Sequence, residues 1–430
     1  MARLAEHKSF TEHKPIESAP LSAKVAISLA QHLGKPCDKL EVKAGDPVLR
    51  GQRIAGSEAK IFAPVHSSVS GKVVSVQDWP HPTLGRAKAI VIESDGLDRA
   101  QEHRSTRAHD EARKLTAGQI RDIVFTAGVV GMGGAAFPTH VKLNPPRPVE
   151  TLIINIAECE PYLTGDSRLA VEKTKEIILG IGLVRTCVSA KETVIAIEEN
   201  KPDAIKALER ETAGTDIALR VLASRYPQGG EKQLVKTVLR KEVPRGKLPF
   251  DVGASIQNVS TVFAIYEAVY LDKPLYERVV TVTGSILANP KNVLCRIGTP
   301  VKDLIDFCGP LSEEPAKIII GGPMMGFAQF TDTVPVIKST TGVIVLGAGE
   351  AAVQDESYCI RCGACIRECP LGLMPCLINM AVEKGFWEQA RELGALDCME
   401  CGLCSFVCPG SRKIVQSIRK AKLELARRKK

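Results

Sequence analysis

The sequence predicts a multidomain protein of mixed α/β and α+β class. Its 430 residues are too many for one hydrophobic core, and 44% of them are hydrophobic, which is enough to build several cores. Short strand-and-turn patterns at 20–95 and 276–345 flank a region in which helix and strand patterns alternate. Near the C-terminus, two motifs of the same spacing hold eight of the 14 cysteines. We therefore expect separate structural units at 1–97, 116–275, 276–346 and 347–430.

The distribution of charge argues against nucleic acid as a partner. The formal net charge is +8, but residues 412–430 contain nine Lys or Arg and one Glu, so this tail alone accounts for it. Aromatic residues make up only 4% of the chain, too few for a surface on which bases stack. The tail could lie against anionic lipid or acidic partner subunits, or it could be a frayed helix in solvent.

No apolar segment is long enough to cross a membrane. The longest candidate, 318–331, has 14 residues and contains Gly-Gly-Pro, whereas a span needs about 20 residues. The first residues, "MARLAEHKSF", are charged and lack the apolar stretch of a signal peptide. We therefore expect a protein that is cytosolic or attached to a membrane from the cytoplasmic side. In that reducing compartment, clustered cysteines indicate metal binding rather than disulfides.

In the first unit, 1–97, the stretches "VKAGDPVLRGQRIAG" and "FAPVHSSVSGKVVSV" alternate apolar and polar residues around Gly45, Gly51 and Gly71. This pair of stretches resembles a barrel-sandwich module of the biotinyl/lipoyl type. Modules of this type can carry a cofactor on a hairpin lysine, and Lys60 lies near that place. The methionines that usually flank such a lysine are absent, which favours a structural or docking role.

A polar linker, 95–116, leads into the central unit, 116–275. The stretches "VETLIINIAE" and "DIALRVLAS" have the composition of buried strands, and "SRLAVEKTKEIILGIG" and "EKQLVKTVLRK" have helical spacing. This alternation predicts a largely parallel sheet covered by helices. The next unit, 276–346, returns to short strands, "ERVVTVTG", "AKIIIGG" and "TGVIVLG", with one helix beginning after Thr299-Pro300. This pattern predicts a small α+β module.

The C-terminal unit, 347–430, carries the strongest chemical signal. "CIRCGACIRECP" from Cys359 and "CMECGLCSFVCP" from Cys398 share the spacing C-x2-C-x2-C-x3-C-P. Bacterial ferredoxins with two [4Fe–4S] clusters have this spacing, and the fourth cysteine of each run binds the other cluster. The predicted ligands are Cys359, Cys362, Cys365 and Cys408 for one cluster, and Cys398, Cys401, Cys404 and Cys369 for the other.

Paired zinc sites and a redox-active thiol pair are the alternatives to iron–sulfur clusters. A zinc ribbon builds one tetrahedral site from two C-x-x-C pairs, which differs from two complete four-cysteine runs. The segment between the runs has the apolar spacing of two helices. Cys376 lies in that segment, outside both motifs, and we expect a buried core cysteine rather than a ninth ligand.

A second signal is the glycine-rich stretch "GVVGMGGAAFPTHVK", Gly128–Lys142. Closely spaced glycines let backbone N–H groups approach an anion. The stretch is not a Rossmann fingerprint, because it follows a helical pattern rather than a strand. Taken alone, it could equally be a structural turn. It is followed, however, by "NIAECEPYLTGDSRL" at 155–169, "YPQGGEKQL" at 226–234 and "SIQNVSTVFAI" at 255–265.

In this order, these blocks resemble the flavin and NADH site in the flavoprotein subunit of respiratory complex I. Over nearly the whole chain, the sequence is most similar to the RnfC family, whose members belong to ion-translocating ferredoxin:NAD oxidoreductase (Rnf) complexes. "NVLCRIGTP" and "GGPMMG" fit the soluble-ligand-binding β-grasp (SLBB) module of that family, at 276–346. The resemblance also implies that 116–275 is an FMN/NADH-binding α/β domain.

The resemblance assigns a role to residues in each block. It implies FMN contacts for Gly131, Gly133, Gly134, Lys142, Asn155, Glu158 and Asn258, NAD(H) contacts for Phe137 and Glu160, and closure of the pocket by Gly230 and Glu231. The alternative for Glu158 and Glu160 is a solvated turn. Cys159 is expected to line the pocket rather than to react.

The implied function is that of a peripheral electron-transfer subunit on the cytoplasmic face of the bacterial inner membrane. NAD(H) exchanges electrons in pairs and clusters exchange them singly, so a flavin is needed between them. Electrons from ferredoxin would arrive through other subunits, pass the clusters and FMN, and reduce NAD+, while other subunits translocate ions. The alternatives are a cobalamin reductase-like flavin/iron–sulfur oxidoreductase, a non-catalytic iron–sulfur electron hub, and a biotin or lipoyl carrier modified on Lys60.

Overall fold

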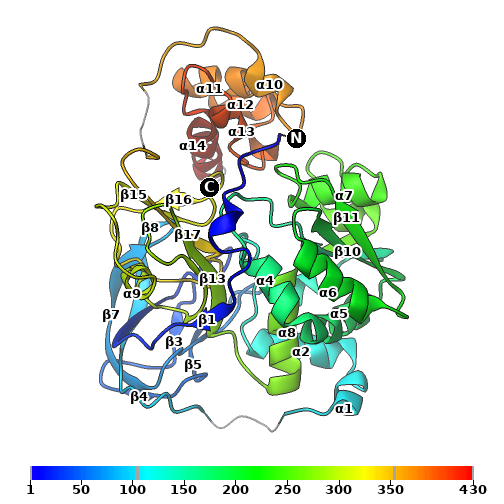
Figure 1. Ribbon diagram of the computed structural model, residues 1–430, viewed down its shortest axis with the longest axis vertical. Helices are drawn as coiled ribbons and strands as arrows, with labels where there is room; N and C mark the ends of the chain where they lie inside the picture. The colour runs from blue at the N-terminus through cyan, green and yellow to red at the C-terminus, as the bar shows by residue number, and fades with distance from the viewer. Residues whose placement is uncertain (1, 102–105, 352–354, 429–430) are drawn as a thin grey trace.

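The chain folds into modules that lie in the order expected from the sequence. This computed structural model describes residues 2–101, 106–351 and 355–428. The helical C-terminal module lies at one end of the molecule beside the N-terminus, with the β-rich modules and the α/β module side by side below it (Figure 1). Within the described ranges, no helix is both long and apolar enough to cross a bilayer.

The N-terminal module packs two antiparallel sheets against each other. One sheet has the order β2 (Lys24–Ser28), β8 (Gly85–Ser94), β7 (Gly71–His81) and β4 (Pro47–Val48), and the other has β3 (Lys39–Leu40), β5 (Arg53–Gly56) and β6 (Val65–His66). Because side chains alternate along a strand, Val25, Ile27, Ile54 and Ile90 face a common apolar core. Lys60 is exposed in the turn between β5 and β6.

The central module is built on a parallel sheet, as expected. Its order is β11 (Ile217–Leu222), β10 (Glu192–Glu198), β9 (Thr151–Ile156) and β12 (Ala254–Asn258). Leu152 and Ile154 pack with α2 (Ala117–Thr126), α5 (Thr174–Val188) and α8 (Val259–Leu271), whereas Ile153 packs on the other face with α7 (Glu231–Leu239). The remaining helices are α1 (His109–Arg113), α3 (Thr139–Lys142), α4 (Gly165–Glu172) and α6 (Pro202–Thr212).

One predicted helix of this module is two helices. The pattern over 167–182 predicts a continuous helix, but α4 ends at Glu172 and α5 begins at Thr174. Lys173 between them has φ −129° and ψ 33°, which lies outside the helical region. Helix α4 packs against α6, α8 and the sheet of the third module, and its first turn contacts Glu158 and Asn258 of the candidate site.

The third module is a mixed sheet with the order β1 (Ile16–Ser18), β14 (Lys291–Arg296), β13 (Glu277–Thr283), β17 (Gly342–Leu346), β15 (Lys317–Ile320) and β16 (Phe327–Ala328). Helix α9 (Val301–Phe307) packs its Val301, Leu304 and Ile305 into the core of this sheet. Strand β1 pairs in parallel with β14, so that Ile16 lies opposite Asn292. The first strand of the chain therefore belongs to this sheet, although it precedes the barrel-sandwich strands in sequence.

The C-terminal module is helical. Helices α11 (Pro375–Glu383) and α12 (Trp387–Glu392) lie between the cysteine runs, as predicted, and the short α10 (Ala364–Arg367) and α13 (Leu403–Phe406) begin within them. The basic tail forms α14 (Ile414–Arg427), which buries Ile414, Ile418 and Ala421 in the core of the module. Of the two alternatives for the tail, a frayed helix in solvent is therefore wrong for 414–427, because one face of this helix is apolar and buried.

Candidate functional site

The glycine-rich stretch forms a closed loop directly after α2. Gly131 N donates a hydrogen bond to Phe137 O (2.8 Å), and Ala136 N donates to Gly131 O (3.1 Å). A Cβ built on Gly133 would lie 3.2 Å from Asn258 Cβ, so this glycine lets the loop rest on Asn258. Gly134 has φ +116°, and a Cβ there would meet no atom within 4 Å. The structure thus brings the predicted glycines to one of the predicted asparagines.

This loop lies at the carboxyl edge of the parallel sheet, where open α/β folds bind ligands. Asn155 is near the end of β9, and its Nδ2 donates to Gly229 O (2.9 Å). Asn258 ends β12 and caps α8, because its Oδ1 accepts from Ser260 N (3.0 Å). Asn258 Nδ2 in turn donates to Asp166 Oδ2 in α4 (2.6 Å). Both asparagines are therefore held in fixed orientations.

Glu158 is used to hold the start of α4. Its carboxylate accepts from Asp166 N (2.8 Å) and Ser167 N (3.1 Å), in the first turn of that helix. The pKa of Glu158 is raised to about 7, chiefly because burial removes its hydration; the charge of Lys8 opposes this rise and the nearby Asp166 adds to it. The backbone at Glu158 has φ +44°. This acidic segment is an ordered loop rather than a solvated turn.

Glu160 points to the neighbouring β-grasp module. Its carboxylate accepts from Met324 N (3.1 Å) and Met325 N (3.0 Å), and it lies 3.2 Å from Tyr226 Oη. A Cβ at Gly322 would lie only 2.1 Å from Glu160 Oε2. Burial raises the pKa of Glu160 to about 7. In this structure the Glu160 carboxylate therefore links the α/β module to the β-grasp module. A contact with nicotinamide would require this carboxylate to face open space instead.

Gly230 and Glu231 begin α7 and face two different parts of the site. Glu231 forms an ion pair with Lys142, the last residue of α3, so the two predicted residues tie α7 to the glycine-rich loop. A Cβ at Gly230 would lie 2.4 Å from Met399 Cε, in the second cysteine run. The start of α7 therefore touches the predicted flavin loop on one side and the cluster module on the other.

The residues present fit a bound flavin. Two buried glutamines in the quoted blocks, Gln228 and Gln257, have amide Nε2 atoms without a hydrogen-bond partner among the residues that the structure describes. Buried amides of this kind are rarely left unpaired, so a ligand that supplies acceptors would satisfy them. The open space over Gly134 leaves room for an anionic group beside backbone N–H groups.

The first predicted cluster site is a cavity of about 390 Å³ in the C-terminal module. Its walls carry the thiols of Cys359, Cys362, Cys365, Cys408 and Cys376. The first three thiols of one run and the last thiol of the other therefore share one cavity. Cys376 is half-buried; it lines this cavity and also packs against the hydrophobic core of the module.

The second predicted site gathers Cys398, Cys401, Cys404 and Cys369. Burial, together with the proximity of Cys398 and Cys369, raises the pKa of Cys401 to about 11 and that of Cys404 to about 12. Glu400 N donates to Cys398 Sγ (3.3 Å) and Leu373 N donates to Cys369 Sγ (3.4 Å), and such bonds tune clusters. Cys369 of the first run therefore lies with three thiols of the second run.

Sequence reasoning missed two residues that organise this region. Lys8 is only 5% exposed, and its Nζ donates to the carbonyl oxygens of Glu158 (2.9 Å), Glu160 (3.0 Å) and Leu163 (2.5 Å). Nothing in "LAEHKSF" signals this role. Tyr226 Oη donates to Cys401 O (2.7 Å). Its position inside the block "YPQGGEKQL" was an available signal.

Family models match the chain in four places. The Nuo51 FMN-binding domain matches 124–267 and the RnfC barrel sandwich hybrid domain matches 2–97. The SLBB domain matches 279–328 and the 4Fe-4S dicluster domain matches 351–421.

The chain also resembles curated proteins over nearly its full length. It is 45% identical to a subunit of the proton-translocating ferredoxin:NAD(+) oxidoreductase complex of Clostridium ljungdahlii, over 97% of this chain and 92% of that one. It is 41% identical to the Na(+)-translocating counterpart of Acetobacterium woodii, over 97% and 94%. It is 40% identical to the corresponding subunit of the ion-translocating oxidoreductase complex of Rhodobacter capsulatus, over 98% and 82%.

Among solved structures, an NAD+-reducing [NiFe]-hydrogenase in the air-oxidised state shares the fold, with a TM-score of 0.51 and 18% identity over 73% of this chain and 65% of that one. The identity and coverage of the curated relatives decide the family. The chain belongs to the RnfC family, the subunits of ion-translocating ferredoxin:NAD(+) oxidoreductase complexes that these relatives represent.

Proposed function

We propose that this chain passes electrons between NAD(H), FMN and two [4Fe–4S] clusters as the peripheral subunit of an Rnf-type complex. Its relatives are named as subunits of ferredoxin:NAD(+) oxidoreductase complexes that translocate ions, and its own modules match FMN-binding and dicluster domains. Other subunits of that complex are its partners, and they translocate the ion. We place the chain on the cytoplasmic face of the bacterial inner membrane, where both NAD(H) and ferredoxin are found.

The observation that carries the proposal is the contact between the second cysteine run and the flavin module. Met399 lies against Gly230 of the flavin module, and a Cβ at Gly402 would lie 2.6 Å from Met324 O in the β-grasp module, whose Met324 N binds Glu160 of the flavin module. The cluster on Cys398, Cys401, Cys404 and Cys369 is therefore the one adjacent to the flavin pocket. The cavity around Cys359 is instead lined by residues of the C-terminal module, among them the exposed Tyr358 and Ile360. This order gives electrons a route between flavin and the far end of the module.

The residues of this chain position and isolate the reacting groups. FMN, when bound, exchanges electron pairs with NAD(H) and single electrons with clusters. The loop of Gly131, Gly133 and Gly134 would hold its phosphate, and Asn155 and Asn258 would hold its polar edges, with Lys142 and Glu231 at the rim. Glu158 would act indirectly, by fixing α4. Phe137 remains the candidate for contact with the dinucleotide, and Glu160 would shape the pocket wall.

The test is to purify the full chain anaerobically and to measure iron, sulfide and flavin in one sample before adding NADH. Two clusters require about eight irons per chain, and the proposal expects one FMN and bleaching of both chromophores by NADH. Eight irons without flavin, even after FMN is added, would leave only an iron–sulfur electron hub. Reduction of a cobalamin instead of ferredoxin-type carriers would favour the cobalamin reductase alternative.

A further inference from the structure

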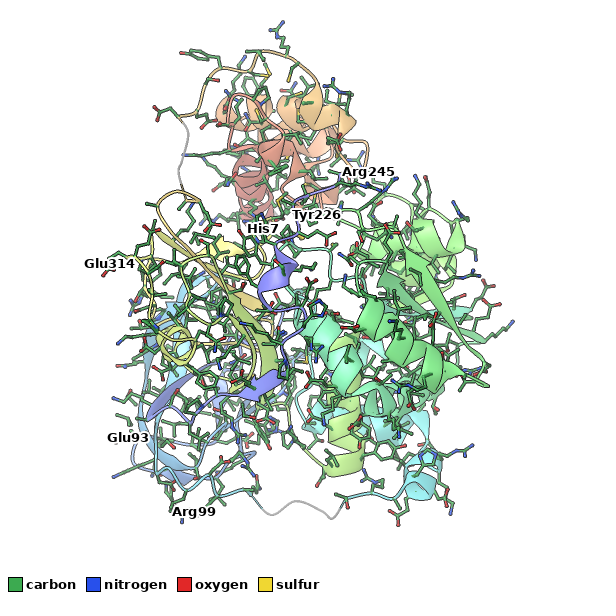
Figure 2. The ribbon with its side chains drawn as sticks, viewed as in Figure 1. His7, Glu93, Arg99, Tyr226, Arg245 and Glu314 are labelled. Atoms are coloured by element: carbon green, nitrogen blue, oxygen red, sulfur yellow. The ribbon has the colours of Figure 1, made fainter. Side chains whose placement is uncertain are left out.

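Tyr226 joins the flavin module to the loop of the adjacent cluster. Its side chain is buried, with 2% exposure, and its Oη donates to the carbonyl oxygen of Cys401 at 2.7 Å. Figure 2 shows Tyr226 where the helical C-terminal module meets the rest of the molecule. Cys401 is a predicted cluster ligand, so this hydroxyl contacts the peptide of a residue that we expect to bind iron.

Tyr226 is held in place by backbone hydrogen bonds and by the residues around its hydroxyl. Its backbone N–H donates to Ala2 O (2.8 Å), and its carbonyl accepts from Ala2 N (3.0 Å). The carboxylate of Glu160 lies beside the hydroxyl at 3.2 Å and is itself fixed by Met324 N and Met325 N. A phenol has one proton to donate, and the shorter distance assigns that proton to Cys401 O. The O–H bond of Tyr226 therefore points toward Cys401 O.

The cluster loop is equally constrained. Leu403 is buried beside Tyr226 and Cys401, and Met324 and Met399 pack against them. Glu400, next to Cys401, accepts from Arg419 Nε (2.9 Å) and Lys422 Nζ (2.6 Å), which ties the loop to α14. Tyr226 and the loop of Cys401 are each held by several contacts. The hydrogen bond between them therefore fixes the second cysteine run against the flavin module.

We propose that Tyr226 is a positioning residue for electron transfer between the flavin and the cluster on Cys398, Cys401, Cys404 and Cys369. Its hydroxyl fixes the Cys401 peptide against the flavin module. It also withdraws electron density from that peptide, which stabilises the reduced, more negative cluster. The inference rests on the proposed function for its rate effect, but the effect on the cluster potential does not require flavin.

The test is Tyr226→Phe in the full chain, because phenylalanine keeps the ring and removes only the hydroxyl. Tyr270→Phe is the matched control, since Tyr270 is also a buried tyrosine whose Oη is paired, with His109 Nδ1 (3.0 Å) in the flavin module. Redox titration followed by electron paramagnetic resonance gives the potential of each cluster. Stopped-flow absorbance with NADH separates flavin reduction from cluster reduction.

We expect Tyr226→Phe to lower the potential of one cluster, to leave the other unchanged, and to slow cluster reduction by about tenfold or more at an unchanged rate of flavin reduction. Tyr270→Phe should match the wild type. Unchanged potentials and rates in Tyr226→Phe, or equal changes in both variants, would overturn the inference. If Tyr226→Phe does not fold, 3,5-difluorotyrosine at position 226 replaces it, because fluorine makes the hydroxyl a stronger donor. This variant should raise the potential of the same cluster, and an unchanged potential would overturn the inference.

Failure of the two proposals can be told apart. A wild-type chain that holds both clusters but neither binds FMN nor reacts with NADH refutes the proposed function. In that case the cluster potentials of Tyr226→Phe and Tyr270→Phe still decide whether Tyr226 acts on its cluster.

Discussion

At the scale of single residues, Lys8 gives the loop at 158–163 its shape; we call this segment the acidic loop. The loop turns around the ammonium group, with carbonyl oxygens of Glu158, Glu160 and Leu163 as its acceptors. Lys8→Met keeps the length of the side chain and removes the donor. Each buried carbonyl left without a partner costs about 1–3 kcal/mol, so we expect a lower unfolding temperature and poor retention of FMN.

The matched control for this change is Lys24→Met, because Lys24 is exposed on β2. Thermal unfolding and the ratio of FMN to iron, measured on both variants, test the prediction. Equal flavin content in the two variants would show that the loop does not depend on Lys8.

Gly133 tests the flavin loop itself. A Cβ at this position would press on Asn258 Cβ at 3.2 Å, so Gly133→Ala must move either the loop or the asparagine. We expect FMN affinity to fall by about tenfold or more while both clusters stay in place. Gly182→Ala in α5 is the control, because nothing lies within 4 Å of its Cβ position. Alanine there should be neutral or stabilising by about 1 kcal/mol.

The sequence predicted some site residues and could not predict others, for a physical reason. The glycine loop was singled out by its closely spaced glycines and Asn258 by the resemblance of its block to the complex I flavoprotein, and the structure brings the two together. Lys8 was not found because its partners lie about 150 residues away and leave no trace in the residues around it. The carboxylate of Glu160 was expected to face the dinucleotide, but it binds backbone N–H groups of another module.

At the scale of elements, the two cysteine runs have equivalent local structures. Gly363 and Gly402 have φ of +73° and +79° and lead into α10 and α13, so that each loop can turn tightly around its cluster. The last cysteine of each run extends to the other site. This exchange predicts that replacing Cys369 and replacing Cys408 remove different clusters.

Cys369→Ser should remove the cluster next to the flavin, and Cys408→Ser the far one. Each variant should keep about four irons in place of about eight. NADH should still reduce the remaining cluster of Cys408→Ser quickly, but that of Cys369→Ser only slowly, because its near cluster is missing. Iron analysis and stopped-flow spectra measure both. Cys376→Ser is the control and should keep both clusters; the loss of one would make Cys376 a ligand.

Elements were predicted from the sequence where their pattern was local, although the boundary between α4 and α5 was missed. Strands β9 and β11 and the helices between the cysteine runs followed from periodicity and composition, whereas β10 and β12 were not singled out. Strand β1 was not predicted. It pairs in parallel with β14, with Ile16 opposite Asn292, so no hairpin turn connects the two strands in the sequence. The basic tail was not assigned to the core, because its charges obscured the apolar face that α14 buries.

At the scale of the whole molecule, buried charged groups join the modules around the candidate flavin site. Lys338 of the β-grasp module is buried, and its Nζ donates to Pro64 O (2.8 Å) in the barrel-sandwich module and to Gly128 O (2.6 Å) at the start of the glycine loop. Glu160 likewise links the α/β module to Met324 and Met325. Buried groups of this kind make the stability of the assembly depend on pH.

Glu160 determines the direction in which the stability of the folded chain changes with pH. Its pKa is about 7 in the folded chain against 4.5 for an ordinary glutamate, so between these values the folded state binds a proton that the unfolded state has released. The stabilising contribution is therefore complete below the unfolded pKa and is lost as pH rises through about 7. The shift corresponds to at most about 3 kcal/mol.

We therefore expect the unfolding temperature of the wild type to fall between about pH 5 and pH 7.5 more steeply than that of Glu160→Gln, whose side chain keeps its size but cannot ionise. Glu242→Gln is the control, because Glu242 is an exposed glutamate paired with Lys236 and its removal should leave the slope unchanged. Other titrating groups contribute equally to the variants, so the difference in slope isolates Glu160. Parallel curves for all three proteins would show that the Glu160 carboxyl stays ionised in the folded chain, and that its contacts with Met324 and Met325 already offset its loss of hydration.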